Sequence, residues 1–427
     1  MALTPSFELA ALKRDWIVGI PGEAFYAMVC ARRDEIAQLS ASERRRGILI
    51  AVDEPVEFAA VFFAALSLSA PVILANPNWG QQERDELNQL VAPAKWFGMD
   101  PGKPCAEIRD LSEGAILVPT GGSTGGVKLA IHSIQSLRAA CAGVQDFIGG
   151  GVINSCCLLP LYHVSGLMQL LRSFYSGGRI RFDDTEVKDY CVSYVPTQLQ
   201  RALSDPRRIQ KLVTARAVFV GGGPLSDSIA EQARGLALPI VPVYGMTETA
   251  AMVAAIPAAE FLQNATCGAV AISAARIEID PDKRIRIHSS ALFSGYHGRP
   301  SLDLADGYLT EDEGFLDAEG RLHVLGRIDR LIISGGEKID PREVEQALLK
   351  IDSVQQVLVI GAPSEEWGQQ VVAFCVPSLG QKLSDDWRTQ LKLNLANYKI
   401  PKRLIVVDAL PVDRRGKVDK EFVQKLL

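Results

Sequence analysis

Short apolar runs alternate with helical segments along the first two thirds of the chain, and this alternation constrains the fold more than any other feature. The runs that we expect to form strands are Ile48–Val52, Val72–Ala75, Ala115–Val118, Ser155–Leu159, Ala217–Val220 and Ile240–Tyr244. Strands that are separated by helices are joined by crossovers, which make them parallel and place helices on both faces of the sheet. The sequence therefore predicts an α/β fold with mostly parallel sheets flanked by helices.

The sequence pattern changes in the last third of the chain. From about Ala275, short charged alternations such as RIEID and RIRIH are typical of antiparallel strands. Further on, Asp340-Pro341-Arg342-Glu343 is typical of a helix start, with an N-cap, a first-turn proline and a capping-box glutamate. A chain of 427 residues also exceeds what one hydrophobic core usually serves. We expect a large domain over residues 1–328 and a small, mobile α+β lid domain over residues 329–427.

Composition excludes several classes of protein. The chain is 48% hydrophobic and 22% charged, which indicates a packed domain rather than a disordered one. A net charge of −5 without a long basic run gives no reason to expect nucleic acid as a partner. The eight cysteines lack metal-ligand spacing, and the amino terminus lacks a signal-peptide apolar region, so we expect reduced thiols in the cytoplasm.

One uncharged stretch, Phe58–Ala75, reaches the length at which a membrane span becomes possible. Pro71 divides it, however, and Asp53 and Pro55 suit the start of a helix. A strand, a buried helix and a second strand explain the stretch better, and we expect no membrane span.

A glycine- and hydroxyl-rich segment, PTGGSTGGVKLAIH, runs from Pro119 to His132. Its glycines allow backbone N–H groups to approach phosphate oxygens closely. It is not a Walker loop, because Leu129 follows the lysine where a serine or threonine is required. Its position after a strand and before a helical run from about Ser133 favours anion binding, and a flexible connector is the alternative. The polar side chains that we expect to contact an anion are Thr120, Ser123, Thr124 and Lys128.

Two further loops follow predicted strands. In the first, Tyr244 offers a ring on which a purine can stack, Thr247 a hydroxyl for phosphate, and Glu248 a carboxylate for Mg²⁺. The second loop permits close approach of a flat ligand through Gly221, Gly222 and Gly223. Loops at the carboxyl ends of parallel strands gather at one edge of the sheet, where open α/β folds bind ligands. Taken singly, each loop is also compatible with an ordinary tight turn.

Four isolated charged residues are further candidates for the functional site, and each of them also has a simpler structural explanation. Asp312 can accept both hydroxyls of a ribose or lie in an acidic surface loop. Arg327 and Asp329 flank the expected domain junction, where a surface ion pair is the alternative. Lys417 follows a glycine near the end of the chain, where most lysines are simply solvated.

Two residues of the apolar segment PLYHVSGLMQLLR are also candidates. His163 either lines a pocket or has a structural role. Arg172 stands among leucines, where an arginine either extends its head to the surface from a helix end or pairs with a carboxylate of a substrate.

Five motifs occur in the order found in one superfamily. The chain resembles the adenylate-forming superfamily of acyl-CoA synthetases, luciferases and peptide-synthetase adenylation domains over nearly its whole length. The resemblance implies two half-reactions, in which a carboxylate first attacks the α-phosphate of ATP and the thiolate of coenzyme A then attacks the acyl-adenylate. The motifs are Thr120–Lys128, Pro160–Gly166, Tyr244–Glu248, Gly326–Glu345 and Pro411–Lys417.

The resemblance also implies a role for each candidate residue. The outer phosphates of ATP would be bound by Ser123, Thr124 and Lys128, and Mg²⁺ by Glu248. Adenine would lie between Tyr244 and Gly221–Gly223, and the ribose against Asp312 and Arg327. Lys417 would bridge the carboxylate and the α-phosphate, Asp329 would be the hinge of the lid, and coenzyme A would enter near Gly335 and Gly336.

The chain departs from the usual pattern in two places. Glu311 replaces the glycine that usually precedes the ribose carboxylate, and Ile134 stands where a histidine is frequent, with His132 two residues earlier. The compact length and the position of Arg172, nine residues after His163, resemble the o-succinylbenzoate–CoA ligases, whose substrate has a second carboxylate. A ligase for another small aryl or acyl acid, an enzyme that loads a separate carrier protein, and a degenerate nucleotide-binding regulator remain alternatives. The sequence does not indicate an oligomeric state.

Overall fold

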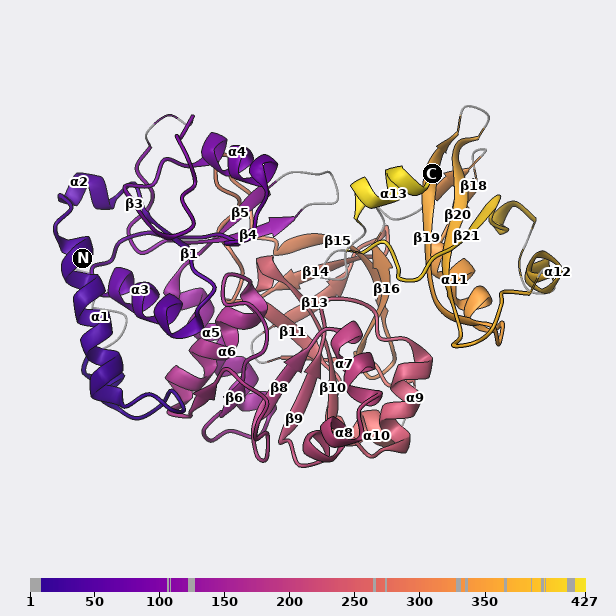
Figure 1. Cartoon of the computed structure of the whole chain (residues 1–427), viewed down its shortest axis with the longest axis horizontal. Coiled ribbons are helices and arrows are strands. Elements are labelled where there is room, and N and C mark those ends of the chain that lie inside the picture. The colour runs from indigo at the N-terminus through magenta and orange to yellow at the C-terminus, as the bar shows by residue number, and fades with distance from the viewer. Residues whose placement is uncertain are drawn as a thin grey trace. The chain divides into compact units, whose positions relative to one another are not determined.

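The chain forms two compact units. The computed structural model describes residues 9–105, 107, 109–121, 127–263, 266–272, 275–327, 332–334, 337–364, 367–384, 386–392, 395, 397–412 and 419–427 (Figure 1). The large unit consists of Met1–Thr310 and Phe315–His323, and the small unit of Glu311–Gly314 and Val324–Leu427. The expected boundary at residue 328 lies outside the described residues and stays a prediction.

The first sheet of the large unit is parallel except at one edge. Its strand order is β3-β1-β2-β4-β5, and only β5 runs antiparallel to its neighbour. Its strands are β1 (Ile48–Ala51), β2 (Val72–Leu74), β3 (Lys95–Gly98), β4 (Ile116–Gly121) and β5 (Val127–His132).

The second sheet has the order β12-β11-β10-β9-β8-β6-β7 and is parallel from β7 to β10. Two antiparallel strands, β11 and β12, complete it. Its strands are β6 (Ser155–Cys156), β7 (Ile180–Arg181), β8 (Cys191–Tyr194), β9 (Ala217–Val220), β10 (Ile240–Met246), β11 (Ala251–Ala255) and β12 (Val270–Ala271). These two sheets confirm the predicted α/β fold.

The charged alternations form antiparallel strands, as predicted. In the third sheet, β13 (Arg276–Ile279) pairs antiparallel with β14 (Arg284–His288). The order β13-β14-β15-β16 is completed by β15 (Tyr308–Leu316) and β16 (Leu322–Arg327).

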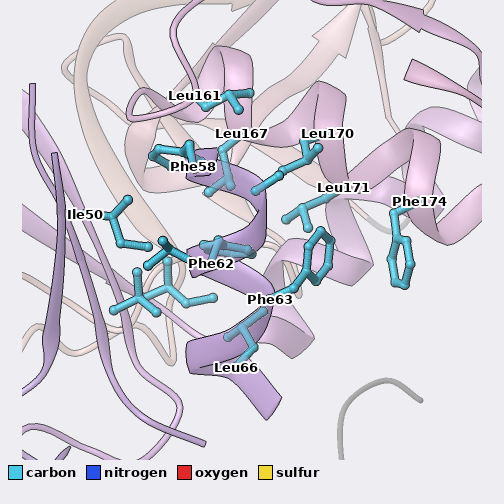
Figure 2. Packing of buried hydrophobic residues seen from close by; sticks show 14 of the residues in the cluster. Ile50, Phe58, Phe62, Phe63, Leu66, Leu161, Leu167, Leu170, Leu171 and Phe174 are labelled. Carbon is cyan, nitrogen blue, oxygen red and sulfur yellow. The ribbon is translucent and has the colours of Figure 1, made fainter. Parts of the chain in front are cut away.

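The uncharged stretch contains a buried helix, α3 (Pro55–Ser67). Glu54 caps it by accepting the N–H groups of Val56 and Glu57, and Pro55 occupies its first turn. Its apolar residues pack against helix α6 (Val164–Ser176), and the ring centroids of Phe63 and Phe174 are 4.8 Å apart (Figure 2). Among the described residues, no helix has both the length and the apolar character needed to cross a membrane.

The remaining helices of the large unit connect the strands and cover the sheets (Figure 1). They are η1 (Leu9–Lys13), α1 (Gly22–Ala37), α2 (Ala41–Arg44), α4 (Gln81–Leu90), α5 (Ile134–Phe147), α7 (Pro196–Leu203), α8 (Pro206–Val213), α9 (Asp227–Gly235), η2 (Thr247–Thr249) and α10 (Ala258–Gln263).

The small unit has its own sheet and core. The sheet contains β17 (Ile332–Ser334), β18 (Glu337–Ile339), β19 (Val354–Ser364), β20 (Gly368–Pro377) and β21 (Arg403–Val406). Its helices are α11 (Pro341–Leu349), α12 (Trp387–Lys392), η4 (Asn397–Lys399) and α13 (Lys420–Leu426). Buried apolar side chains of α11, β19 and β20 form one core cluster.

Helix α11 begins where the sequence predicted. Asp340 is the N-cap and accepts the N–H of Arg342 at 2.9 Å, and Pro341 lies in the first turn. The predicted capping box is wrong, because both oxygens of Glu343 accept hydrogen bonds from Lys399 Nζ, at 2.7 and 2.6 Å. A charged donor provides a stronger hydrogen bond than a backbone N–H does.

Candidate active site

The glycine-rich segment connects two antiparallel strands. Strands β4 and β5 pair from Ile116 opposite His132 to Gly121 opposite Val127, with Thr120 opposite Lys128. Helix α5 begins directly after the segment, with Ser133 as its N-cap, which confirms the expected helical run from about Ser133. The end of the segment is itself a strand, β5, which was not expected. The described part brings Thr120 and Lys128 together, while Ser123 and Thr124 lie outside the described residues.

Glu86 fixes the point where the chain enters β5. Its Oε2 atom accepts the N–H of Val127 at 2.7 Å, which ties β5 to helix α4. Lys128 is the next residue, so its backbone position is set by this hydrogen bond.

The segment from Tyr244 to Glu248 ends strand β10 and forms the short helix η2. A Cβ atom on Gly245 would lie 1.8 Å from the carbonyl oxygen of Ala251, so only glycine fits there. Glu248 follows, 7% exposed, and its Oε1 atom accepts the hydroxyl of Tyr296 at 2.5 Å. In the described part of the chain, this is the one hydrogen bond of the Glu248 carboxylate, which leaves Oε2 for another ligand.

Tyr296 is a functional candidate that the sequence analysis missed. Besides Glu248, its hydroxyl lies 3.4 Å from that of Tyr308, and its ring contacts Phe293 at a centroid distance of 4.9 Å. The Nζ atom of Lys128 is 5.8 Å from the centroid of the same ring. Burial and the neighbouring Glu248 carboxylate raise the pKa of Tyr296, so its hydroxyl stays protonated and donates to Glu248.

His132 stabilises the segment from Tyr244 to Glu248 through a hydrogen bond of its ring. It is 1% exposed, with Nε2 2.7 Å from the carbonyl oxygen of Thr247 and Nδ1 3.1 Å from the hydroxyl of Ser136. Burial lowers the pKa of His132 to about 4, so the imidazole is neutral at physiological pH. Nε2–H therefore donates to Thr247, and Nδ1 accepts from Ser136. This histidine positions helix η2 rather than facing solvent.

The two predicted nucleotide loops lie on neighbouring strands. Strands β9 and β10 pair in parallel, with Val220 opposite Pro242, so Gly221 and Tyr244 follow at the same edge of the sheet. A Cβ atom on Gly221 would lie 2.4 Å from Val243 Cγ2, and Gly222 has a φ of +80°. Gly222 and Gly223 are exposed. The glycines therefore allow a tight strand exit beside Tyr244.

In the small unit, Asp312 and Arg327 form a pair. Asp312 lies on β15, is 8% exposed, and its Oδ1 atom is 3.9 Å from Arg327 Nη1. The alternative of an acidic surface loop is wrong, because the segment is a strand and the carboxylate is buried. Asp329, Gly335, Gly336 and Lys417 lie outside the described residues.

Arg172 is buried in the middle of α6. It is 3% exposed, its Nε donates to the carbonyl oxygen of Met168 at 2.9 Å, and its guanidinium carbon is 5.6 Å from the ring centroid of Phe219. The alternative of a helix-end arginine that reaches the surface is therefore wrong. Within the described residues, no carboxylate lies at ion-pair distance from this guanidinium, which stays charged although burial lowers its pKa.

The surroundings of Arg172 contain neutral thiols and an unpaired hydroxyl. Burial raises the pKa of Cys141 and of Cys157 to about 12 and also raises the pKa of Cys191, so these thiols remain protonated. The Ser173 hydroxyl is buried and has no hydrogen-bond partner in the described structure. Figure 2 shows Leu167, Leu170 and Leu171 of the same helix beside the phenylalanines of α3.

His163 is the N-cap residue of α6, and its ring contacts that of Tyr162 at a centroid distance of 4.7 Å. Gly166 lies in the first turn of α6 and packs against the preceding turn. A Cβ atom on it would lie 2.2 Å from the carbonyl oxygen of Pro160, so this turn requires glycine there. A cavity of about 270 Å³ adjoins this turn and is lined partly by Phe58, Tyr162 and Phe182. The role of His163 as a pocket residue stays a prediction.

Sequence comparison places the chain in a family. The AMP-binding enzyme family matches residues 85–297, and the AMP-binding enzyme C-terminal domain matches residues 343–417. The 2-succinylbenzoate–CoA ligase of Listeria monocytogenes is 32% identical over 336 residues, which cover 75% of this chain and 71% of that protein. The chain therefore belongs to the family of AMP-binding enzymes, the adenylate-forming superfamily that its motifs indicated.

Solved structures show the same fold. The o-succinylbenzoate CoA synthetase (MenE) of Bacillus subtilis in complex with the acyl-adenylate intermediate OSB-AMP superimposes with a TM-score of 0.78 at 24% identity, over 95% of this chain and 93% of that one. The same Bacillus protein in complex with ATP and a magnesium ion gives a TM-score of 0.77 at 24% identity, over 95% and 94% of the two chains.

Proposed function

We propose that this chain is an ATP- and Mg²⁺-dependent carboxylate–CoA ligase that acts on o-succinylbenzoate through an acyl-adenylate. Membership of the AMP-binding enzymes supports the reaction class, and the similarity to 2-succinylbenzoate–CoA ligases supports the substrate. The corresponding pathways are menaquinone and phylloquinone synthesis. All eight cysteines are free, which agrees with a cytoplasmic location.

The buried Arg172 is the observation that carries the substrate assignment. A buried cation without an anionic partner is costly, and the protonated thiols around it do not offset its charge. A carboxylate group of the substrate would complete the site through paired hydrogen bonds to the guanidinium. A substrate with two carboxylates can therefore anchor one beside Arg172 while the other reacts.

In the first half-reaction, an oxygen of the free carboxylate attacks the α-phosphorus of ATP, and the bond to the β-phosphate breaks to release pyrophosphate. Thr120 and Lys128 lie on adjacent strands and would bind the departing phosphates together with Ser123 and Thr124. Lys417 would bridge the carboxylate and the α-phosphate and stabilise the developing charge. Tyr244 and Gly221–Gly223 would hold adenine, and Asp312 and Arg327 the ribose.

The residues present fit a magnesium ion. Mg²⁺ is usually held by one or two carboxylates together with phosphate oxygens and water, and Glu248 supplies one buried carboxylate with a free oxygen. Thr247 precedes it and would offer a hydroxyl to the same phosphates. Bound there, the ion would neutralise charge on the pyrophosphate leaving group.

In the second half-reaction, the thiolate of coenzyme A attacks the carbonyl carbon of the adenylate, and AMP leaves with the electrons of the broken C–O bond. Asp329 would be the hinge about which the small domain moves between the two reactions, and coenzyme A would enter near Gly335 and Gly336. Substitution of Lys417 by alanine should abolish adenylation while thioester formation from isolated adenylate continues.

The proposal is tested by pyrophosphate release with ATP and Mg²⁺ across a panel of carboxylic acids, followed by mass detection of the CoA thioester. Release with o-succinylbenzoate and a matching thioester is the expected result. Release only with a different acid would support the ligase reaction but contradict the assignment of o-succinylbenzoate as the substrate. Adenylate without a thioester would indicate a carrier-protein partner, and ATP binding without any turnover would indicate a regulator.

A further inference from the structure

The short segment from Phe293 to His297 connects the strand of Lys128 with the turn of Glu248. Along β5, Ile131 N–H donates to the Gly295 carbonyl at 2.9 Å, and His297 N–H donates to the Leu129 carbonyl at 2.8 Å. At its other end, Phe293 N–H donates to the backbone carbonyl of Glu248 at 2.9 Å. These hydrogen bonds hold the segment between the proposed phosphate-binding and metal-binding residues.

Tyr296 projects from this segment and contacts both proposed ligands with its side chain. Its hydroxyl donates to Glu248 Oε1 at 2.5 Å, and its ring lies 5.8 Å from Lys128 Nζ. A hydrogen bond to one carboxylate oxygen fixes the plane of the carboxylate and leaves the other oxygen available. A ring face at this distance attracts an ammonium group and restricts its position.

We propose that Tyr296 is a positioning residue that orients Glu248 for the metal ion and Lys128 for the phosphates, so that both are prearranged before MgATP binds. This inference rests on the proposed function. Tyr296 acts through the two residues it contacts, and no step of the reaction occurs on it.

The substitution Tyr296→Phe separates the two contacts, because it keeps the ring beside Lys128 and removes only the hydroxyl. The Mg²⁺ concentration for half-maximal pyrophosphate release should rise about 10- to 100-fold, as is usual when a hydrogen bond to a metal ligand is lost. Thioester formation from isolated adenylate should change by less than about twofold, because that half-reaction does not require the proposed metal contact. Tyr296→Leu removes both contacts and should in addition weaken ATP binding measured without Mg²⁺.

Tyr308→Phe is the matched control. It removes a hydroxyl 3.4 Å from that of Tyr296 in the same cluster and leaves the hydrogen bond to Glu248 intact. Its Mg²⁺ requirement should stay within about threefold of the wild type. An equal loss in Tyr308→Phe and Tyr296→Phe would overturn the proposal, because it would show that the packing of the cluster matters rather than the hydrogen bond.

Binding of Mn²⁺ to the complex with a non-hydrolysable ATP analogue, followed by electron paramagnetic resonance, provides a readout without turnover. Tyr296→Phe should weaken Mn²⁺ binding by the same factor as it raises the Mg²⁺ requirement. In a Glu248→Gln background, the same substitution should have little further effect, because the two residues act as one unit. Unchanged Mn²⁺ binding in a folded Tyr296→Phe variant would overturn the proposal. A wild-type protein that releases no pyrophosphate with any acid would instead contradict the proposed function, and the Mn²⁺ comparison would still decide the role of Tyr296.

Discussion

Glu248 and Arg172 are both buried charged residues of the large unit, and their surroundings differ. The Glu248 carboxylate accepts a hydrogen bond from Tyr296, and the turn that carries it is held by His132 through Thr247. Arg172 donates to its own helix and faces an aromatic ring and neutral thiols, without a carboxylate among the described residues. The contacts of Glu248 are supplied by the protein itself, whereas Arg172 would need a carboxylate of a ligand to complete its site. We infer that the first serves chemistry common to the family and the second serves substrate choice.

Of the substitutions in these two regions, Glu248→Gln should have the largest effect. The amide keeps an oxygen that accepts from Tyr296 but loses the charge that would bind Mg²⁺. Pyrophosphate release should fall on the order of 10³-fold, because a catalytic metal stabilises the transition state by several kcal/mol. The melting temperature should change little. A loss of less than about tenfold would contradict the role of Glu248 as the metal ligand.

Substitution of Arg172 by methionine should affect the two substrates differently. The Michaelis constant for the dicarboxylate should rise on the order of 10²-fold, since removing one partner of a buried ion pair costs about 2–5 kcal/mol, while that for ATP stays constant. Stability of the free protein should stay equal or increase, because methionine fills the space without a buried charge. Arg138→Met, at an exposed position of α5 where the guanidinium lies over the ring of Tyr175, is the control and should change neither Michaelis constant. Equal, small effects on both substrates would exclude Arg172 from the pocket.

His132 should make the stability of the prearranged region depend on pH. Its pKa is about 4 in the folded state and 6.5 as the reference value for the unfolded chain, so the unfolded chain binds more protons between these values. Stability is therefore retained above pH 6.5 and decreases as the pH falls toward 4, by on the order of 3 kcal/mol over the whole window. His132→Gln, which can still donate to Thr247, should remove this component. Calorimetry at pH 7 and pH 5 measures this component as the difference between the two melting temperatures. The same difference in the wild type and in His132→Gln would contradict the assignment.

The smallest effects should come from replacing one buried serine by alanine in each of the two regions. Ser173→Ala removes a buried hydroxyl without a partner and should leave the free energy of unfolding unchanged or raise it by about 1 kcal/mol. Ser136→Ala removes a hydroxyl that is hydrogen-bonded to His132 and should lower that free energy by about 1 kcal/mol. Changes of the same sign in both variants, measured by denaturant unfolding, would contradict the distinction between the regions.

Local patterns predicted much of the fold. The alternation of apolar runs and helices predicted the parallel strands, and Asp340-Pro341 predicted the start of α11. Strand β5 was not predicted, because its residues continue the glycine-rich segment and no turn signal marks where the strand begins. Its pairing with β4 becomes visible only in the folded structure.

The candidate site was predictable where neighbours in sequence are also neighbours in space. The residues of the Tyr244–Glu248 segment lie together at the end of β10 and in η2. Tyr296 was not predictable, because its partner Glu248 lies 48 residues earlier and a single tyrosine has no distinguishing pattern. The direction of Arg172 was also left open, since the sequence shows that it lies in a helix but not which face of that helix is buried.

The buried thiols beside Arg172 have a consequence for the proposed chemistry. An acyl-adenylate is a strong electrophile, and a thiolate near it would be acylated in competition with coenzyme A. Because burial raises the pKa of Cys141 and Cys157 to about 12, almost none of either thiol is ionised at neutral pH. If the acyl group is bound beside Arg172, the pocket wall is rich in sulfur and yet inert, and the enzyme is protected from acylating itself.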